Sequence, residues 1–222
     1  MSANTRRHGL EAARLYFVCE ARPGDRDPEP LLRAALENGA DLIQLRDRSL
    51  SDHELIAAAR TFRALANEHD ALFILNNRPD LVEACGADGV HVGQDDPSPA
   101  DARSTMPPGT LLGLSTHSEE QIEAAHGMGD AGPDYISVGP VWETPTKPGR
   151  PAAGLELIET AARIAELPWF AIGGIDPDNV GRVIAAGAQR VVVVRAIRDA
   201  DDPGSATRSL REAVEGGAEV RG

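Results

Sequence analysis

The stretch Ala84-Cys-Gly-Ala-Asp-Gly-Val-His-Val-Gly-Gln-Asp-Asp96 contains the unit from which this chain is built. A glycine stands where a left-handed residue ends a helix, a short β-branched strand follows it, and polar residues follow the strand. Similar stretches recur at residues 37–47 (ENGADLIQLRD) and 185–196 (AAGAQRVVVVRA), with a looser copy at 127–140. Each copy is typical of a helix that leads into a buried strand.

Eight short apolar segments of this kind alternate with segments of helical pattern. Ser51 with Glu54, and Asp176 before Pro177, are spacings that predict helix starts. Strands that alternate with helices imply parallel crossovers, and eight such units predict an α/β fold of the single-domain (β/α)8 TIM barrel class. The expected strands are Leu15–Cys19, Leu42–Leu45, Leu72–Leu75, Gly89–Val92, Leu111–Ser115, Tyr135–Val138, Trp169–Ile172 and Arg190–Val194.

The domain is expected to span residues 12–222, after a flexible N-terminal leader at residues 1–11. The leader carries two arginines but lacks the apolar region of a secretory signal. With no such signal, Cys19 and Cys85 are expected to be reduced thiols. No apolar run reaches the length of a membrane span, so we expect a cytoplasmic protein.

Composition also limits the possible partners. Hydrophobic residues make up 41% of the 222 residues, enough for a sizeable core, whereas aromatic residues make up only 4%, so aliphatic side chains must fill it. The net charge of −13 argues against binding to nucleic acid or to an anionic membrane surface. Small-molecule substrates are the expected partners, and a homo-oligomer is possible.

Polar side chains follow the predicted strands, at the barrel end where active sites lie. Gln44, Arg46 and Arg48 alternate along the chain, so they project to one side and form a fork suited to a diphosphate. A charged rim paired with acidic neighbours explains the same pattern equally well.

Hard oxygen ligands follow two neighbouring strands. Asp95 and Asp96 come after the fourth strand, and Asn77 comes after the third. Mg²⁺ is usually held by one or two carboxylates together with substrate phosphates, so this cluster suits that ion. An ordinary loop with a helix cap is the competing interpretation.

Two further segments suit phosphate groups. Thr144, Thr146 and Lys147 offer two hydroxyls and an ammonium in one loop, although an exposed loop is the commoner meaning of such a composition. Gly173-Gly174, with the end of the last strand, resembles the backbone phosphate site of many barrels, although glycine also serves tight turns.

His117 is the histidine that we place at a strand end among polar residues. It suits a general acid or base, and a capping role is the competing interpretation.

In order and spacing, these motifs resemble the thiamine-phosphate synthase family from Leu15 to about Ala200. The matching segments are Gln44-Leu-Arg46-Asp-Arg48, Asn76-Asn77-Arg78, Gly93-Gln-Asp-Asp96, Ser115-Thr-His117, Gly139-Pro140 with Thr144-Pro-Thr146-Lys147, and Ala171-Ile-Gly-Gly-Ile175. The resemblance implies an enzyme that condenses 4-amino-2-methyl-5-pyrimidinylmethyl diphosphate with a thiazole phosphate, giving thiamine phosphate and pyrophosphate. In the family the pyrimidine–diphosphate bond breaks first, and the thiazole nitrogen captures the resulting cation.

The resemblance also implies the site residues. Arg46, Lys147 and Ser115 would be catalytic. The cofactor would be Mg²⁺, held by Asp96 with Asn77 as a weakened second ligand. The pyrimidine diphosphate would be held by Gln44, Arg46, Arg48, Asn76, Ser115 and Lys147, and the thiazole phosphate by Thr144, Thr146, Gly173, Gly174, Val194 and Arg195.

The chain departs from the family pattern at three positions. Arg48 replaces a lysine, Asn77 replaces the metal-binding aspartate, and Arg195 replaces a serine. A thiazole tautomerase shares an arginine, a residue other than aspartate and a histidine at the positions of Arg48, Asn77 and His117, but lacks the metal motif and the Thr-x-Thr-Lys loop. A barrel that binds thiamine precursors without turning them over is a third hypothesis, which Asn77 would support.

Overall fold

Eight parallel strands pair in sequence order, and β8 closes on β1 to complete the barrel in the computed structural model, which describes residues 1–143 and 151–219. The predicted single-domain (β/α)8 barrel is therefore confirmed, with strand ends within one residue of those expected. The strands are β1 (Leu15–Cys19), β2 (Leu42–Leu45), β3 (Leu72–Asn76), β4 (Gly89–Val92), β5 (Leu111–Thr116), β6 (Tyr135–Val138), β7 (Trp169–Ile172) and β8 (Val191–Val193).

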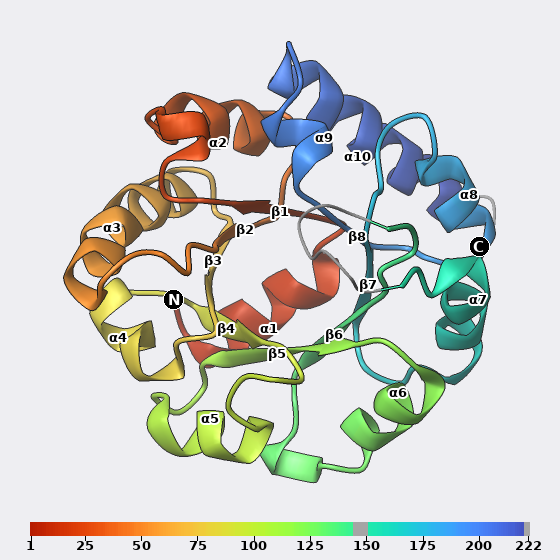
Figure 1. Cartoon of the computed structure of the whole chain (residues 1–222), viewed down its shortest axis with the longest axis horizontal. Coiled ribbons are helices and arrows are strands. Elements are labelled where there is room, and N and C mark those ends of the chain that lie inside the picture. The colour runs from red at the N-terminus through yellow and green to blue at the C-terminus, as the bar shows by residue number, and fades with distance from the viewer. Residues whose placement is uncertain (144–150, 220–222) are drawn as a thin grey trace.

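Helices surround the strands in a ring (Figure 1). They are α2 (Glu29–Glu37), α3 (Asp52–Glu68), α4 (Val82–Cys85), α5 (Pro99–Thr105), α6 (Glu119–His126), α7 (Gly154–Ile164), α8 (Val180–Ala185), α9 (Arg195–Arg198) and α10 (Pro203–Glu219). Short 3₁₀ turns, η1 (Pro23–Asp25), η2 (Pro79–Leu81) and η3 (Gly129–Ala131), complete the connections. None of the helices within residues 1–143 and 151–219 is long and apolar enough to cross a membrane.

The helix ends follow the local signals in most places. Ser51 and Glu54 form the full capping box at the start of α3, and Gly86 ends α4 with φ of 64°. The prediction at Asp176 is wrong, because α8 begins only at Val180. The Asp176 carboxylate instead accepts hydrogen bonds from the N–H groups of the second and third residues after it, at 3.0 Å each, and so closes a turn.

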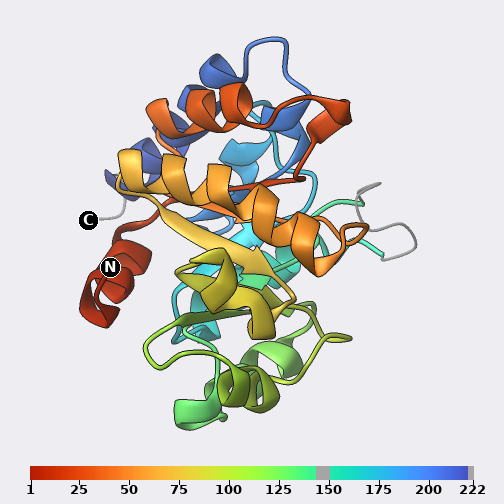
Figure 2. The ribbon, with the colours of Figure 1, turned by 90° about the vertical axis from the view of Figure 1, so that its left-hand side faces the viewer.

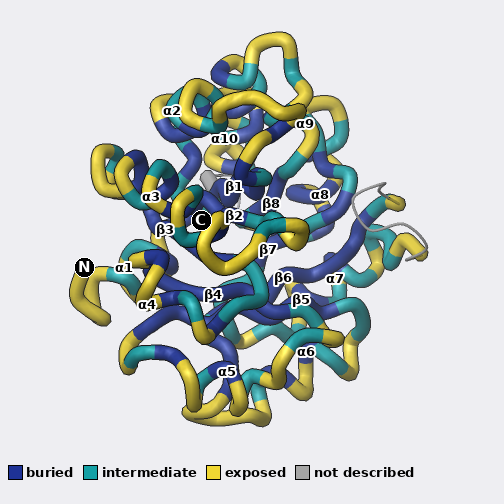
Figure 3. The backbone as a smooth tube through the Cα atoms, turned by 60° about the vertical axis from the view of Figure 1, so that its left-hand side comes forward, coloured by how far each residue is buried: buried dark blue, intermediate teal, exposed yellow. Residues whose placement is uncertain are grey.

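The core has two layers, one on each side of the strands. The outer layer lies between strands and helices, where Phe62 of α3 packs against Phe73 of β3. The inner layer fills the barrel and includes Tyr16, Tyr135 and Phe170. Figure 3 shows the strands as buried and the outward sides of the helices as exposed, which is the two-sided burial expected of parallel strands.

The N-terminal residues form a helix, α1 (Ala3–Ala12), in place of the flexible leader expected at residues 1–11. Ser2 caps this helix, and Leu10, only 2% exposed, joins the inner core layer. Figure 1 shows α1 crossing the centre of the ring, and Figure 2 places it at one end of the barrel. The burial of Leu10 and an ion pair from Arg6 to Asp88 explain why the segment is ordered.

Candidate active site

A cavity of about 470 Å³ opens at the carboxyl ends of the strands. It lies where a barrel of this class places its chemistry. Asn77 is outside its lining, and Thr144, Thr146 and Lys147 lie outside the described residues. The other predicted site residues all line it: Gln44, Arg46, Arg48, Asn76, Asp96, Ser115, Gly173, Gly174, Val194 and Arg195.

Two arginines from the end of β2 supply positive charge to one wall. The guanidinium of Arg46 is partly buried, and it donates no hydrogen bond to any described residue. Burial, followed by the like charge of Arg48, lowers the pKa of Arg46. Both effects penalise a bare cation, and a bound anion would offset them.

A carboxylate stands beside these arginines, at the end of β4. The side chain of Asp96 is 10% exposed, and Arg48 approaches it at 3.3 Å. The N–H of Gly93 and the Nδ2 of Asn77 donate to its two oxygens at 2.8 and 2.9 Å. Asp96 is therefore held from three sides, and its contact with Arg48 is the longest of the three.

A second part of the cavity lining is backbone. Gly173 and Gly174 follow β7 with φ of 111° and 68°. A Cβ on Gly173 would lie 2.5 Å from the Cα of Pro140, so the close approach of two loops requires glycine there. The N–H groups of Gly174 and Arg195 donate to no described residue, so both remain available to an anion.

Known proteins resemble the chain along most of its length. The family model described as thiamine monophosphate synthase matches residues 15–197. The thiamine-phosphate synthase of Thermus thermophilus is 49% identical, with 91% of this chain and 98% of the relative aligned. That of an Arthrobacter species is 45% identical, covering 94% and 97%.

The chain belongs to the thiamine monophosphate synthase family. A solved structure agrees, since thiamine phosphate pyrophosphorylase from Pyrococcus furiosus superposes with a TM-score of 0.83 at 33% identity, over 97% of this chain and 99% of that one. As a member of the family, the chain is an enzyme that condenses the aminopyrimidine diphosphate with a thiazole phosphate to give thiamine phosphate.

The side-chain oxygens around Asp96 fit the metal ion that thiamine monophosphate synthases are expected to use. Within the described part of the chain, His, Cys, Asp and Glu side chains form no group of three or more that could hold a metal. Asp96 is a single hard carboxylate, and the buried Oδ1 of Asn76 accepts no hydrogen bond from a described residue. This set suits an ion such as Mg²⁺, which takes one or two carboxylates and completes its shell with phosphate oxygens and water.

Asn77 changes how this corner behaves without metal. An aspartate at position 77, as in the family pattern, would place a second carboxylate beside Asp96, and neighbouring like charges repel each other. Asn77 instead donates from Nδ2 to one of the Asp96 oxygens at 2.9 Å. The backbone of Asn77 has φ of 49°, a left-handed conformation that both Asn and Asp tolerate.

The side of the cavity towards the barrel interior holds residues that sequence analysis missed. Tyr16, His91 and Ser137 line it although they lie within strands. A polar residue inside an apolar strand was the only available signal, and His91 in Gly-Val-His-Val carried it. His117 was anticipated, and its Nδ1 contacts the carbonyl oxygen of Gly139 while the ring lines the cavity.

Proposed function

We propose that the described wall residues divide the reaction between them, with the arginines and Asp96 at the diphosphate and the glycine-rich wall at the thiazole phosphate. The observation that carries this division is the charge arrangement of the cavity. Arg46 is a partly buried cation that donates to no described residue, and among the described residues Arg48 donates only to Asp96. A diphosphate is the group that two neighbouring guanidiniums hold best, because each can bind two of its oxygens.

The chemistry needs charge stabilisation more than proton transfer. When the bond between the pyrimidine methylene carbon and the diphosphate oxygen breaks, the electron pair leaves with oxygen. Arg46 and Arg48 would stabilise that growing negative charge, as preorganised donors do elsewhere. The thiazole nitrogen then donates its lone pair to the methylene carbon, so the new C–N bond replaces the broken C–O bond.

Mg²⁺ is proposed to bind at Asp96. When bound, it would neutralise part of the diphosphate charge. Arg48 would then exchange its 3.3 Å contact with Asp96 for the diphosphate, leaving the carboxylate oxygens to the ion. Asn76 would contribute its unpaired Oδ1 to the same corner.

The second substrate must be held with its nitrogen towards the methylene carbon. The N–H groups of Gly174 and Arg195, which donate to no described residue, suit its phosphate. Val194 lines the same cavity. Holding both substrates in one cavity supplies the proximity that a two-substrate reaction needs. Thr144, Thr146 and Lys147 remain predicted contributors to these phosphate contacts.

The direct test is turnover of the purified full chain. With both substrates and millimolar Mg²⁺, we expect thiamine phosphate and pyrophosphate in equal amounts. Chromatography measures the thiamine phosphate, and a pyrophosphate assay measures the second product. Chelation by EDTA should abolish product, and added Mg²⁺ should restore it. Folded protein that forms no product from saturating substrates would overturn the proposal, and product formation insensitive to EDTA would overturn its metal part.

A further inference from the structure

A chain of hydrogen bonds crosses the barrel interior beneath the cavity. Gln44 Nε2 contacts the Tyr16 hydroxyl, which lies 3.2 Å from the Tyr135 hydroxyl. The Tyr135 hydroxyl lies 3.3 Å from His91 Nδ1, and His91 Nε2 lies 3.0 Å from Ser115 Oγ. The five residues come from β1, β2, β4, β5 and β6, and none is more than 8% exposed. These hydrogen bonds therefore connect two residues of the cavity lining, Gln44 and Ser115, through side chains shielded from bulk water.

The protons along this chain run in one direction. Gln44 Nε2 can only donate, so the Tyr16 oxygen accepts from it. Tyr135 is the acceptor that the described residues offer to the buried Tyr16 O–H, so that proton is directed to the Tyr135 oxygen. Burial raises the pKa of both phenols, so each keeps its proton. Tyr135 then donates to His91 Nδ1, which places the proton of a neutral imidazole on Nε2, facing Ser115.

The contact between His91 and Tyr135 requires a glycine, which has no side chain, at position 113. His91 of β4, Gly113 of β5 and Tyr135 of β6 lie in one row of the sheet. A Cβ on Gly113 would stand 2.4 Å from His91 Nδ1 and 2.2 Å from Cζ of Tyr135. Both rings are confined by the core, so any side chain at position 113 would push them apart.

The two ends of the chain both reach the cavity. Ser115 Oγ accepts from His91, so its own O–H is left to point towards a ligand. Gln44 donates through Nε2, and no described residue donates to its Oε1. Ser137 Oγ lies 3.4 Å from His91 Nε2, a longer and weaker second contact for the same proton. The cavity thus presents one donor at Ser115 and one acceptor at Gln44.

We propose that His91 is a positioning residue and that, with Tyr135 and Tyr16, it fixes the hydrogen-bonding polarity with which the cavity reads a pyrimidine. This inference rests on the proposed placement of the aminopyrimidine at Gln44 and Ser115. A ring nitrogen accepts from Ser115, and an exocyclic amino group donates to Gln44 Oε1. A 4-oxo pyrimidine presents an N–H to the Ser115 donor and a carbonyl oxygen to the Gln44 acceptor. Donor then meets donor, and acceptor meets acceptor.

The first test breaks the chain at a residue that does not line the cavity. Tyr135→Phe removes one hydroxyl and leaves Ser115 and Gln44 in place. We expect the preference for the amino substrate, measured as the inhibition constant of its 4-oxo analogue divided by the KM of the amino form, to fall by about tenfold. The KM for the thiazole phosphate should stay the same.

Phe170→Leu is the matched control. Phe170 packs on both Tyr16 and Tyr135 at 5.6 and 5.7 Å between ring centres, yet it belongs to no hydrogen bond of the chain. It should lower the melting temperature without changing the preference. If Tyr135→Phe also leaves the preference unchanged, the chain is only structural and the proposal is overturned.

The second test reads the proton on His91 directly. In ¹⁵N-histidine-labelled protein, with the signal assigned from the spectrum of His91→Asn, we expect a neutral ring with Nε2 protonated and Nδ1 bare. Tyr135→Phe should leave a mixture of both tautomers. Protonation on Nδ1 in the native chain would reverse the polarity and overturn the proposal. This measurement needs no turnover, so it separates failure of the inference from failure of the proposed function.

Discussion

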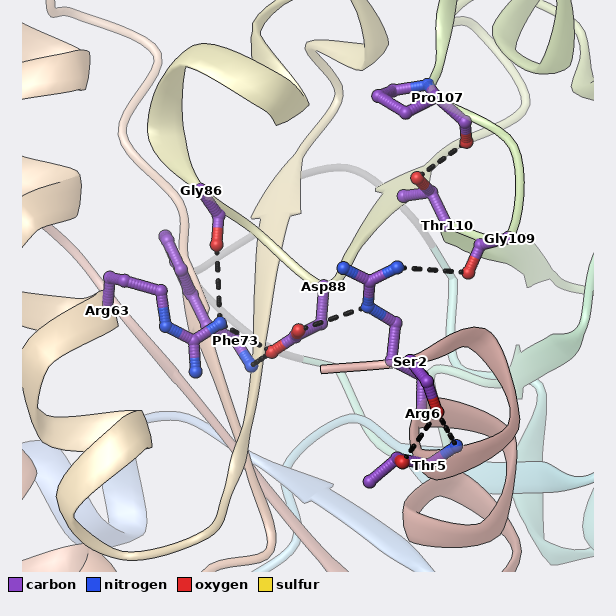
Figure 4. A network of polar contacts seen from close by, with 10 residues as sticks. All are labelled: Ser2, Thr5, Arg6, Arg63, Phe73, Gly86, Asp88, Pro107, Gly109 and Thr110. Atoms are coloured by element: carbon purple, nitrogen blue, oxygen red, sulfur yellow. Dashed lines mark hydrogen bonds and ion pairs between the residues drawn. The ribbon is translucent and has the colours of Figure 1, made fainter.

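The two ends of the barrel use the same pairing of arginine and aspartate to opposite effect. At the end where strands begin, Asp88 accepts from Arg6, Arg63 and the N–H of Phe73, at 3.2, 2.6 and 3.0 Å (Figure 4). At the end where strands finish, Arg46 donates to no described residue and Arg48 only approaches Asp96. Asp88 is saturated with hydrogen bonds from three donors, whereas the Arg46 guanidinium is left without a partner among the described residues.

The saturated arrangement repeats around the barrel. Asp41, Asp88 and Asp134 each precede an even-numbered strand and accept from a backbone N–H near the start of the strand before. An arginine from the surrounding helices completes each site, at 2.6, 2.6 and 2.7 Å. The turns that contain them therefore tie strands to helices. Charge composition alone therefore does not separate a structural arginine from a candidate binding arginine; their hydrogen-bond partners do.

The largest effect on stability is expected at the end where strands begin. Asp88→Ala leaves Arg6, Arg63 and a backbone N–H without their acceptor, and we expect a loss of about 3 kcal/mol in unfolding free energy. Denaturant titration measures this, while kcat of the folded fraction should stay the same. Asp52→Ala is the control, because the Asp52 carboxylate is 61% exposed and pairs with Arg78, and it should cost less than about 1 kcal/mol. A similar loss in both variants would contradict the structural assignment of Asp88.

The opposite outcome is expected at the mouth. Arg46→Ala should leave the melting temperature nearly unchanged, because the guanidinium donates to no described residue. It should lower kcat/KM by roughly 10- to 100-fold, the equivalent of one charge-assisted hydrogen bond of about 1.5–3 kcal/mol. Steady-state kinetics and calorimetry test both parts. Arg33→Ala, at an exposed arginine paired with Glu29 and Glu68, should change neither. Near-normal turnover of Arg46→Ala would show that Arg46 does not bind the diphosphate.

Asn77→Asp should lower the Mg²⁺ concentration that the mouth needs. The added carboxylate beside Asp96 contributes about 1 kcal/mol of attraction for a cation even in a water-like dielectric, so the Mg²⁺ midpoint of activity should fall roughly fivefold. Asp95→Asn is the companion variant. If it raises the midpoint while Asn77→Asp does nothing, Asp95 serves as the second ligand. If neither shifts it, Asp96 and the diphosphate suffice, and position 77 is no ligand.

The smallest effect is expected at His117. A dissociative condensation needs no side-chain proton transfer before the bond breaks, so His117→Gln should keep most of the synthase rate. Gln can still donate to the Gly139 carbonyl that His117 Nδ1 contacts. A thiazole tautomerisation would instead lose the roughly 10²- to 10⁴-fold contribution of an acid–base group. Both activities should be followed in the same preparation, and a synthase rate that collapses while substrate binding is intact would contradict this assignment.

The site residues that could be found from the sequence share one property. Gln44, Arg46, Asp96 and Ser115 stand at or just after a strand end, so strand prediction together with the barrel rule placed them in the cavity lining. His91 and Tyr135 could not be found this way. They lie inside strands, where alternation points a side chain into the barrel. Whether an inward polar residue meets a partner depends on neighbouring strands.

By itself, the sequence determined the eight strands and their alternation with helices, because each strand is a local apolar run and several helices carry cap and glycine stop signals. It also determined the identity of the charged groups at the mouth. Only the tertiary structure decided which of those charges are satisfied, since Asp88 and Arg6 meet across 82 residues of chain. It also decided that α1 is ordered, because Leu10 gains its burial from strands distant in sequence. Local patterns fix elements, whereas pairing and burial are set by contacts that no local pattern encodes.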